Sequence, residues 1–152
     1  MSDRRRRSAQ FLAAALAALA LAACGSASPP TQQLRLSATQ ACAAANAQAQ
    51  RIATPTGPAG GVTFLQRGVA VFTPELRQLR GLRAPSELAS TYSTAMNAFA
   101  RKLTAVNAAI TGINKGADPL DTLRTLQRRL SPIESREDAA WHALGVPACL
   151  NR

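Results

Sequence analysis

The sequence predicts an all-α fold, an up-down four-helix bundle, and three observations support this. Apolar residues recur at spacings of three and four over four successive stretches, which is the periodicity of an amphipathic helix. No stretch alternates apolar and polar residues as a half-buried strand does. The links between the stretches are short and rich in proline, glycine or helix-capping residues, and short links favour antiparallel neighbours.

The first helix is expected from about residue 31 to residue 52. Alanine dominates its apolar face, and alanine combines high helix propensity with a small side chain that lets a neighbour approach closely. The face comprises Leu34, Ala38, Ala41, Ala45, Ala49 and Ile52. The proline- and glycine-rich stretch 54–61 ends this helix and forms a loop.

The second helix is expected over about residues 62–82, and Pro74 interrupts it. Its apolar seam comprises Leu65, Val69, Phe72, Leu76 and Leu79. Either Thr73 caps a new helix that has Pro74 at its first position, or one helix continues with a kink. Because the seam stays in phase across the proline, we favour a kinked helix.

The third helix follows the link 83–85, with Ser86 as the expected N-cap, and stops at residues 114–116. Its apolar seam is the most regular in the chain: Leu88, Tyr92, Ala95, Phe99, Leu103, Val106, Ile110 and Ile113. The fourth helix opens with Asp118 as the cap and Pro119 at the first position, and Gly145 ends it. Pro132 poses the same alternative as Pro74, since Ser131 could cap a new helix there, and a kinked fourth helix is expected as well.

The N-terminal residues have the pattern of an export signal. Four arginines, residues 4–7, precede an uncharged apolar run over residues 11–23. A run of this length suits the apolar region of a signal peptide and is too short for a transmembrane helix, which needs about 20 residues.

The stretch Leu21-Ala22-Ala23-Cys24 resembles the lipobox of bacterial lipoproteins. The resemblance implies that residues 1–23 are a signal peptide that is removed and that Cys24 becomes the lipid-bearing first residue. It further implies two or more acyl chains, palmitate among them, which give firm anchorage to the cell membrane on its extracytoplasmic face. A plain secreted protein with an incidental cysteine is the alternative.

The mature chain then divides into two parts. Residues 24–31 form a lipidated flexible tether, since the stretch from Gly25 to Gln33 is uncharged and rich in serine and proline. Residues 32–152 form the bundle domain.

Cys42 and Cys149 remain once Cys24 carries lipid. Export places them in an oxidising compartment, so an even pair predicts a disulfide. In an up-down bundle the end of the fourth helix lies beside the start of the first, which brings the two cysteines close together. Two unpaired buried thiols are the alternative.

The C-terminal stretch Leu144-Gly145-Val146-Pro147-Ala148-Cys149 carries a second resemblance. It is similar to the tail of small secreted or lipid-anchored helical proteins of high-GC Gram-positive bacteria, a class that mostly lacks assigned activities. The resemblance implies the bundle and the disulfide, and it carries over no catalytic residue.

The chain is strongly basic. Removal of residues 1–23 takes away four arginines and Asp3, which lowers the net charge from +10 to +7. The expected partners are the membrane, through the lipid on Cys24, and an envelope protein or an anionic surface. A solvated basic surface without a specific partner is the alternative, and nucleic acid is not expected as a partner of an exported lipoprotein.

Residue types that carry out chemistry are scarce. The single histidine, His142, excludes histidine clusters that bind metal and histidine dyads, and no glycine-rich phosphate loop or haem-attachment motif is present. We therefore expect no catalytic residue, no metal site and no cofactor. The acidic residues of the fourth helix are expected to form surface ion pairs with nearby arginines: Glu134, Glu137 and Asp138 with Arg128, Arg129 and Arg136.

Four side chains are candidates for ligand binding. Tyr92 and Trp141 would line an apolar cavity between helices, and Met96 and His142 would hold a haem between two helices of the bundle. Ordinary core packing is the alternative for Tyr92, Trp141 and Met96.

The leading functional hypothesis is a non-enzymatic, lipid-anchored envelope protein that acts through protein or surface contacts. The second is a carrier of an apolar ligand in the bundle core. A hydrophobic pocket with a few inward polar groups would favour the carrier, whereas an exposed apolar patch on a solid bundle would favour the interaction module.

Overall fold

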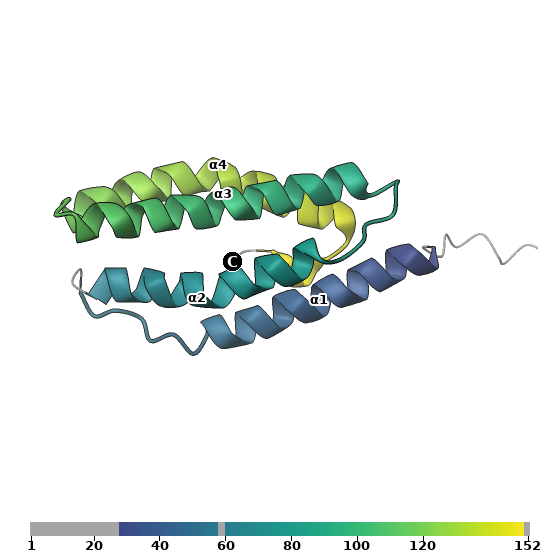
Figure 1. Cartoon of the computed structure of the whole chain (residues 1–152), viewed down its shortest axis with the longest axis horizontal. Helices are drawn as coiled ribbons and strands as arrows, with labels where there is room; N and C mark the ends of the chain where they lie inside the picture. The colour runs from purple at the N-terminus through teal and green to yellow at the C-terminus, as the bar shows by residue number, and fades with distance from the viewer. Residues whose placement is uncertain (1–27, 58–59, 151–152) are drawn as a thin grey trace, which may run out of the picture.

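The computed structural model describes residues 28–57 and 60–150, and in this part of the chain it contains helices and no strand. Four helices follow one another: α1 (Pro29–Ala49), α2 (Gly61–Arg80), α3 (Ala89–Asn114) and α4 (Pro119–Leu144). A short 3₁₀ helix, η3 (Pro147–Cys149), follows α4. Figure 1 shows that each helix runs antiparallel to the one before it, which confirms the predicted all-α, up-down four-helix fold.

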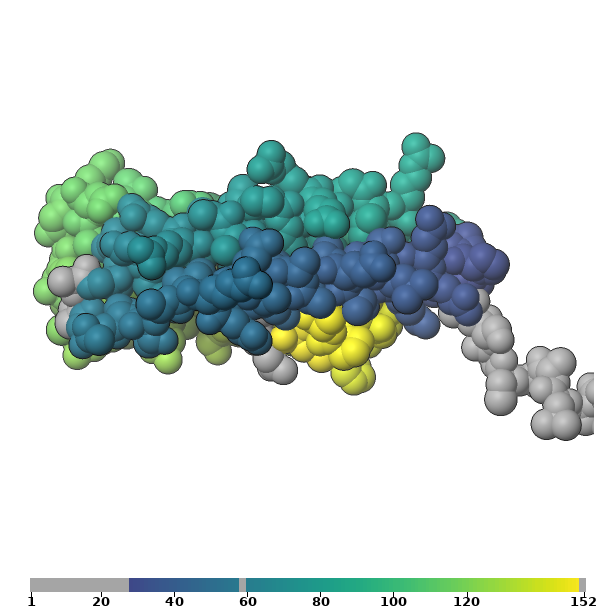
Figure 2. All heavy atoms as spheres, turned by 90° about the horizontal axis from the view of Figure 1, so that it is seen from below, coloured from purple at the N-terminus to yellow at the C-terminus, as the bar shows by residue number. Residues whose placement is uncertain are grey.

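The bundle consists of two helical hairpins. The α3 and α4 helices pack against each other more extensively than any other pair, and α2 joins this hairpin to α1. Between α1 and the end of α4 lies the C-terminal segment with η3, which contacts both helices. Figures 1 and 2 show this segment against α1.

The core is uneven along the bundle. We call the half with the start of α1, the end of α4 and η3 the tail half, and the half with the α1–α2 and α3–α4 connections the loop half (Figure 1). The tail half holds the main cluster of buried apolar residues, which includes Leu34, Leu79, Phe99 and Leu144. In the loop half the buried cluster comprises Ala105, Ala109 and Leu126.

Both ends of α4 follow the sequence prediction. The Asp118 carboxylate accepts a hydrogen bond from the Asp121 backbone N–H at 2.8 Å and caps the helix, with Pro119 at the first position. Gly145 ends the helix in the left-handed conformation, with φ of 71°, which glycine adopts at little cost. The Val146 N–H then donates to the Trp141 carbonyl at 3.1 Å and turns the chain back toward the core.

The starts of α1 and α3 differ from the prediction. The α1 helix begins at Pro29, so residues 29–31 of the expected tether are helical. Prolines fit the first turn of a helix because its N–H groups have no partner there, and the Thr31 hydroxyl donates to Glu87 at 3.1 Å. Ser86 is not the N-cap of α3: it lies in a turn in which the Leu88 N–H donates to the Pro85 carbonyl at 3.0 Å, and α3 begins after that turn.

Pro74 and Pro132 lie inside unbroken helices. The α2 helix continues through Pro74 and α4 continues through Pro132, so neither Thr73 nor Ser131 caps a new helix. Each proline lacks the N–H that would bond to the carbonyl four residues earlier, and both are exposed.

None of the helices in the described part of the chain combines the length and the apolar character needed to cross a membrane.

Candidate functional site

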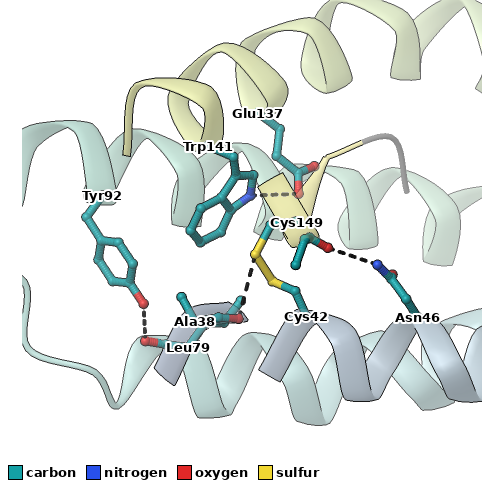
Figure 3. The surroundings of a disulfide bond; sticks show 9 residues. Ala38, Cys42, Asn46, Leu79, Tyr92, Glu137, Trp141 and Cys149 are labelled. Carbon is teal, nitrogen blue, oxygen red and sulfur yellow. Dashed lines mark hydrogen bonds between the residues drawn. A yellow bond between two sulfur atoms is a disulfide. The ribbon is translucent and has the colours of Figure 1, made fainter. Parts of the chain in front are cut away.

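Three of the four candidate ligand residues are core residues. Tyr92, Met96 and Trp141 are all buried in the main cluster. The Tyr92 and Trp141 rings meet edge to face, with centroids 6.0 Å apart, and the Tyr92 hydroxyl donates to the Leu79 carbonyl at 2.6 Å (Figure 3). Burial raises the pKa of Tyr92 to about 12. Packing thus accounts for these side chains.

Met96 and His142, the two ligands of the haem hypothesis, lie in different surroundings. Met96 is buried in the core, whereas His142 is exposed on α4. A haem bound between them would need both side chains in one cavity, and neither residue lines any of the three cavities described below. The structure does not bring the two together.

Cys42 and Cys149 form the predicted disulfide, with Cα atoms 5.2 Å apart (Figure 3). The bond joins the middle of α1 to η3. Two hydrogen bonds add to this connection: the Asn46 amide donates to the Ala148 carbonyl at 2.9 Å, and Arg35 Nε donates to the Leu144 carbonyl at 2.8 Å. Cys24, the predicted lipidation site, lies outside the described residues, as does the whole predicted signal peptide.

A buried ion pair links α3 to α4. Lys102 Nζ lies 2.8 Å from Glu137 Oε2, and their side chains are 10% and 1% exposed. The Trp141 indole N–H donates to Glu137 Oε1 at 3.4 Å, and Lys102 Nζ lies 5.7 Å from the centroid of the Phe99 ring. Burial raises the pKa of Glu137, and the positive charge of Lys102 opposes that rise.

This ion pair replaces the expected surface pairing of Glu137 with the arginines of α4. The sequence carried a signal for it. Lys102 is three residues after Phe99 and Glu137 is four residues before Trp141, so both charges fall on the apolar faces of their helices. Opposite charges on two facing apolar seams predict an ion pair in the core. A search for known catalytic and metal-binding motifs does not detect such a pair.

An apolar groove opens in the loop half, where the buried apolar cluster is small. Its volume is about 200 Å³, and all four helices or their extensions contribute to it. The lining consists of Ala49, Ile52, Phe64, Leu65, Gly68, Val69, Phe72, Lys102, Leu103, Val106, Leu130 and Glu134. Among these, the predicted seam residues Leu65, Val69 and Phe72 are only half-buried, so α2 does not form a closed seam in this half.

Two polar side chains border the groove: Lys102, which also forms the ion pair, and Glu134, which is half-buried. Gly68 leaves space at the wall, since a Cβ built there meets no atom within 4 Å. An apolar hollow with a few polar groups at its edge is the usual form of a site for small apolar ligands.

No set of three or more His, Cys, Asp or Glu side chains in the described part of the chain is arranged to hold a metal ion. The arrangement can bind and orient an apolar group. No protein-family model, curated protein or solved structure matches this chain.

Proposed function

We propose that the protein is a lipid-anchored, extracytoplasmic binding protein without enzymatic activity, and that its groove holds one acyl chain of a lipid. The apolar groove carries this proposal. Most of the apolar side chains in its walls are only half-buried, so they still expose apolar surface to water. A ligand that covers this surface gains about 25 cal/mol of binding free energy for each Å² of apolar area buried.

The size of the groove favours an acyl chain. About 200 Å³ is more than the roughly 150 Å³ that holds a benzene ring and less than the roughly 300 Å³ at which pockets for drug-sized ligands begin. A thin, flexible chain can place one segment in such a space, whereas a haem macrocycle is too large for it.

The edge of the groove favours a ligand with a polar end. Lys102 is held in its ion pair with Glu137, whereas the half-buried Glu134 carboxylate can accept a hydrogen bond from a hydroxyl or a protonated acid group at the end of a ligand. A fatty acid or lipid that enters by its hydrocarbon end can leave its polar group at this edge.

The sequence analysis favours a protein that acts through protein or surface contacts. The exposed apolar side chains give this hypothesis less support than the groove gives to ligand binding. The large exposed hydrophobic residues in the described part of the chain are Leu36, Phe64 and Leu120, and they belong to three different helices. Single exposed apolar side chains are ordinary on protein surfaces.

Mass spectrometry of the full-length chain after expression in a bacterial host tests both parts of the proposal. Under denaturing conditions, the expected mass lacks residues 1–23 and includes the acyl groups on Cys24. Under native conditions in the presence of palmitic acid, one further non-covalent molecule is expected. A mass without acyl groups would contradict the anchor, and a native mass without bound palmitic acid would contradict the groove.

Gly68→Leu tests where the acyl chain sits. The new side chain points into open space and fills the groove, so bound palmitic acid is expected to disappear from the native mass spectrum. Ala70→Leu is the matched control, because it adds a leucine to the exposed face of the same helix and leaves the groove open. Equal binding by both variants would place the ligand elsewhere.

A further inference from the structure

A second hollow lies between α3 and α4, and it shares no residue with the apolar groove. Its volume is about 390 Å³, and its lining is polar and basic: Thr94, Asn97, Ala98, Arg101, Pro132, Ile133 and Arg136. Arg101 comes from α3 and Arg136 from α4, so the two guanidinium groups belong to opposite walls of one hollow.

Neither guanidinium is neutralised within the part of the chain that the structure describes. The ion pairs there join Lys102 to Glu137 and Arg124 to Asp121. Glu137 is buried in the core, and Glu134 lines the apolar groove. Neither Arg101 nor Arg136 belongs to either of these ion pairs, and no acidic residue among those described lines the hollow, so its positive charge can attract an anion.

The polar lining adds to this positive charge. The Asn97 amide donates one hydrogen bond to Ser93 Oγ at 3.4 Å, and its second N–H is left for a ligand. Ala98 lines the same hollow with a small side chain, which leaves room for a ligand between the two helices.

The basic hollow continues toward the loop half. Arg129 is seven residues before Arg136, so it lies on the same face of α4, about 10 Å away along the helix axis. It lines a separate hollow of about 470 Å³ that residues of α3, of α4 and of their connection form. That hollow ends at Asp118 and Asp121, whose negative charges set the limit of the basic stretch.

We propose that this hollow binds a phosphate group of an elongated, phosphate-bearing chain, with Arg101 and Arg136 contacting the same phosphate from the two helices. A phosphate carries more oxygen atoms and more negative charge than a carboxylate, so it suits two guanidinium forks that approach from two helices. The position of the arginines in a hollow between two helices fits a thin chain better than a flat membrane surface.

Isothermal titration of the full-length chain with tripolyphosphate tests this proposal. Tripolyphosphate is expected to bind, and the double variant R101Q/R136Q is expected to bind it at least about tenfold more weakly, because each arginine contributes a charge-assisted hydrogen bond. The control R77Q/R80Q removes the same charge from exposed positions of α2 and is expected to change binding by less than about threefold.

Four outcomes would overturn the proposal: no binding of tripolyphosphate, an equal loss in both double variants, equally tight binding of citrate, or arginine-dependent binding to phosphatidylglycerol vesicles without binding of tripolyphosphate. The second would show a general charge effect, the third a site for carboxylates and the fourth a membrane-facing surface. Both double variants change exposed side chains, so their thermal unfolding checks that a loss of binding is not a loss of fold.

Discussion

At the scale of single residues, Lys102 and Glu137 occupy positions where the sequence pattern calls for apolar side chains. A buried ion pair costs desolvation free energy that its attraction only partly recovers, so it adds less to stability than its short 2.8 Å distance suggests. It lies at the inner edge of the apolar groove, because Lys102 belongs to both.

A double-mutant cycle measures the coupling between these two charges. Lys102→Met should lower the free energy of unfolding at pH 7 by about 3 kcal/mol, because it leaves the buried Glu137 carboxylate without its partner, and Glu137→Gln should lower it by less, because the amide avoids the desolvation that raises the Glu137 pKa. The double variant should lose less than the sum of the two, and urea denaturation measures all three. Additive losses would mean that the two side chains do not interact in solution.

The pH dependence of stability provides a separate measurement on Glu137. Its pKa is raised above the ordinary value of 4.5, chiefly by burial, so protonation favours the folded state. The stability that this group contributes is complete below pH 4.5 and is lost as the pH rises through the raised pKa. Thermal unfolding from pH 4 upward should show this decline in the wild type and a smaller one in Glu137→Gln; parallel curves would rule out this assignment.

At the scale of helices, composition and spacing predict much of the structure, and tertiary contacts explain the differences. Both ends of α4 are encoded locally, since Asp118 and Pro119 act on the first turn of the helix and Gly145 acts at its last residue. At the start of α1, Thr31 also donates a hydrogen bond to Glu87, which is 56 residues away, and no local pattern reports that contact. Likewise, the spacing of Leu65, Val69 and Phe72 predicts an apolar face but not how tightly another helix will cover it.

Pro74 provides a test of whether the packing of α2 requires the backbone hydrogen bond that is missing at this residue. Pro74→Ala restores an N–H that can bond to the Ala70 carbonyl, so it should raise the free energy of unfolding by about 1–3 kcal/mol. Chemical denaturation measures the gain, and Thr73→Ala at the neighbouring exposed position is the control. A loss of stability in Pro74→Ala would show that the packing of α2 requires the missing hydrogen bond.

At the scale of the whole molecule, the disulfide and the uneven core divide the bundle into a firmly packed half and a looser one. The topology and the cysteine pair follow from the sequence, because helix parity brings Cys42 and Cys149 to the same region. The apolar groove does not follow, because it depends on how completely side chains from four different helices cover one another. The hollow between α3 and α4 likewise requires knowledge of which arginines face one another.

Reduction of the disulfide should destabilise the molecule substantially. The bond joins residues 107 positions apart, and closing a loop of that length is worth about 4–5 kcal/mol in the chain-entropy model. Thermal unfolding with and without a reducing agent measures the effect, and the variant C42A/C149A should be insensitive to the reductant. Equal unfolding temperatures for the wild type under both conditions would contradict this expectation.

The same bond makes a closed covalent ring of the backbone from Cys42 to Cys149, and this ring contains the whole of α2, α3 and α4. A protease that cuts the chain once within the ring opens it but releases no fragment. The nicked protein therefore migrates as one species until it is reduced, and two pieces separate only then. A single cut therefore leaves all four helices covalently joined.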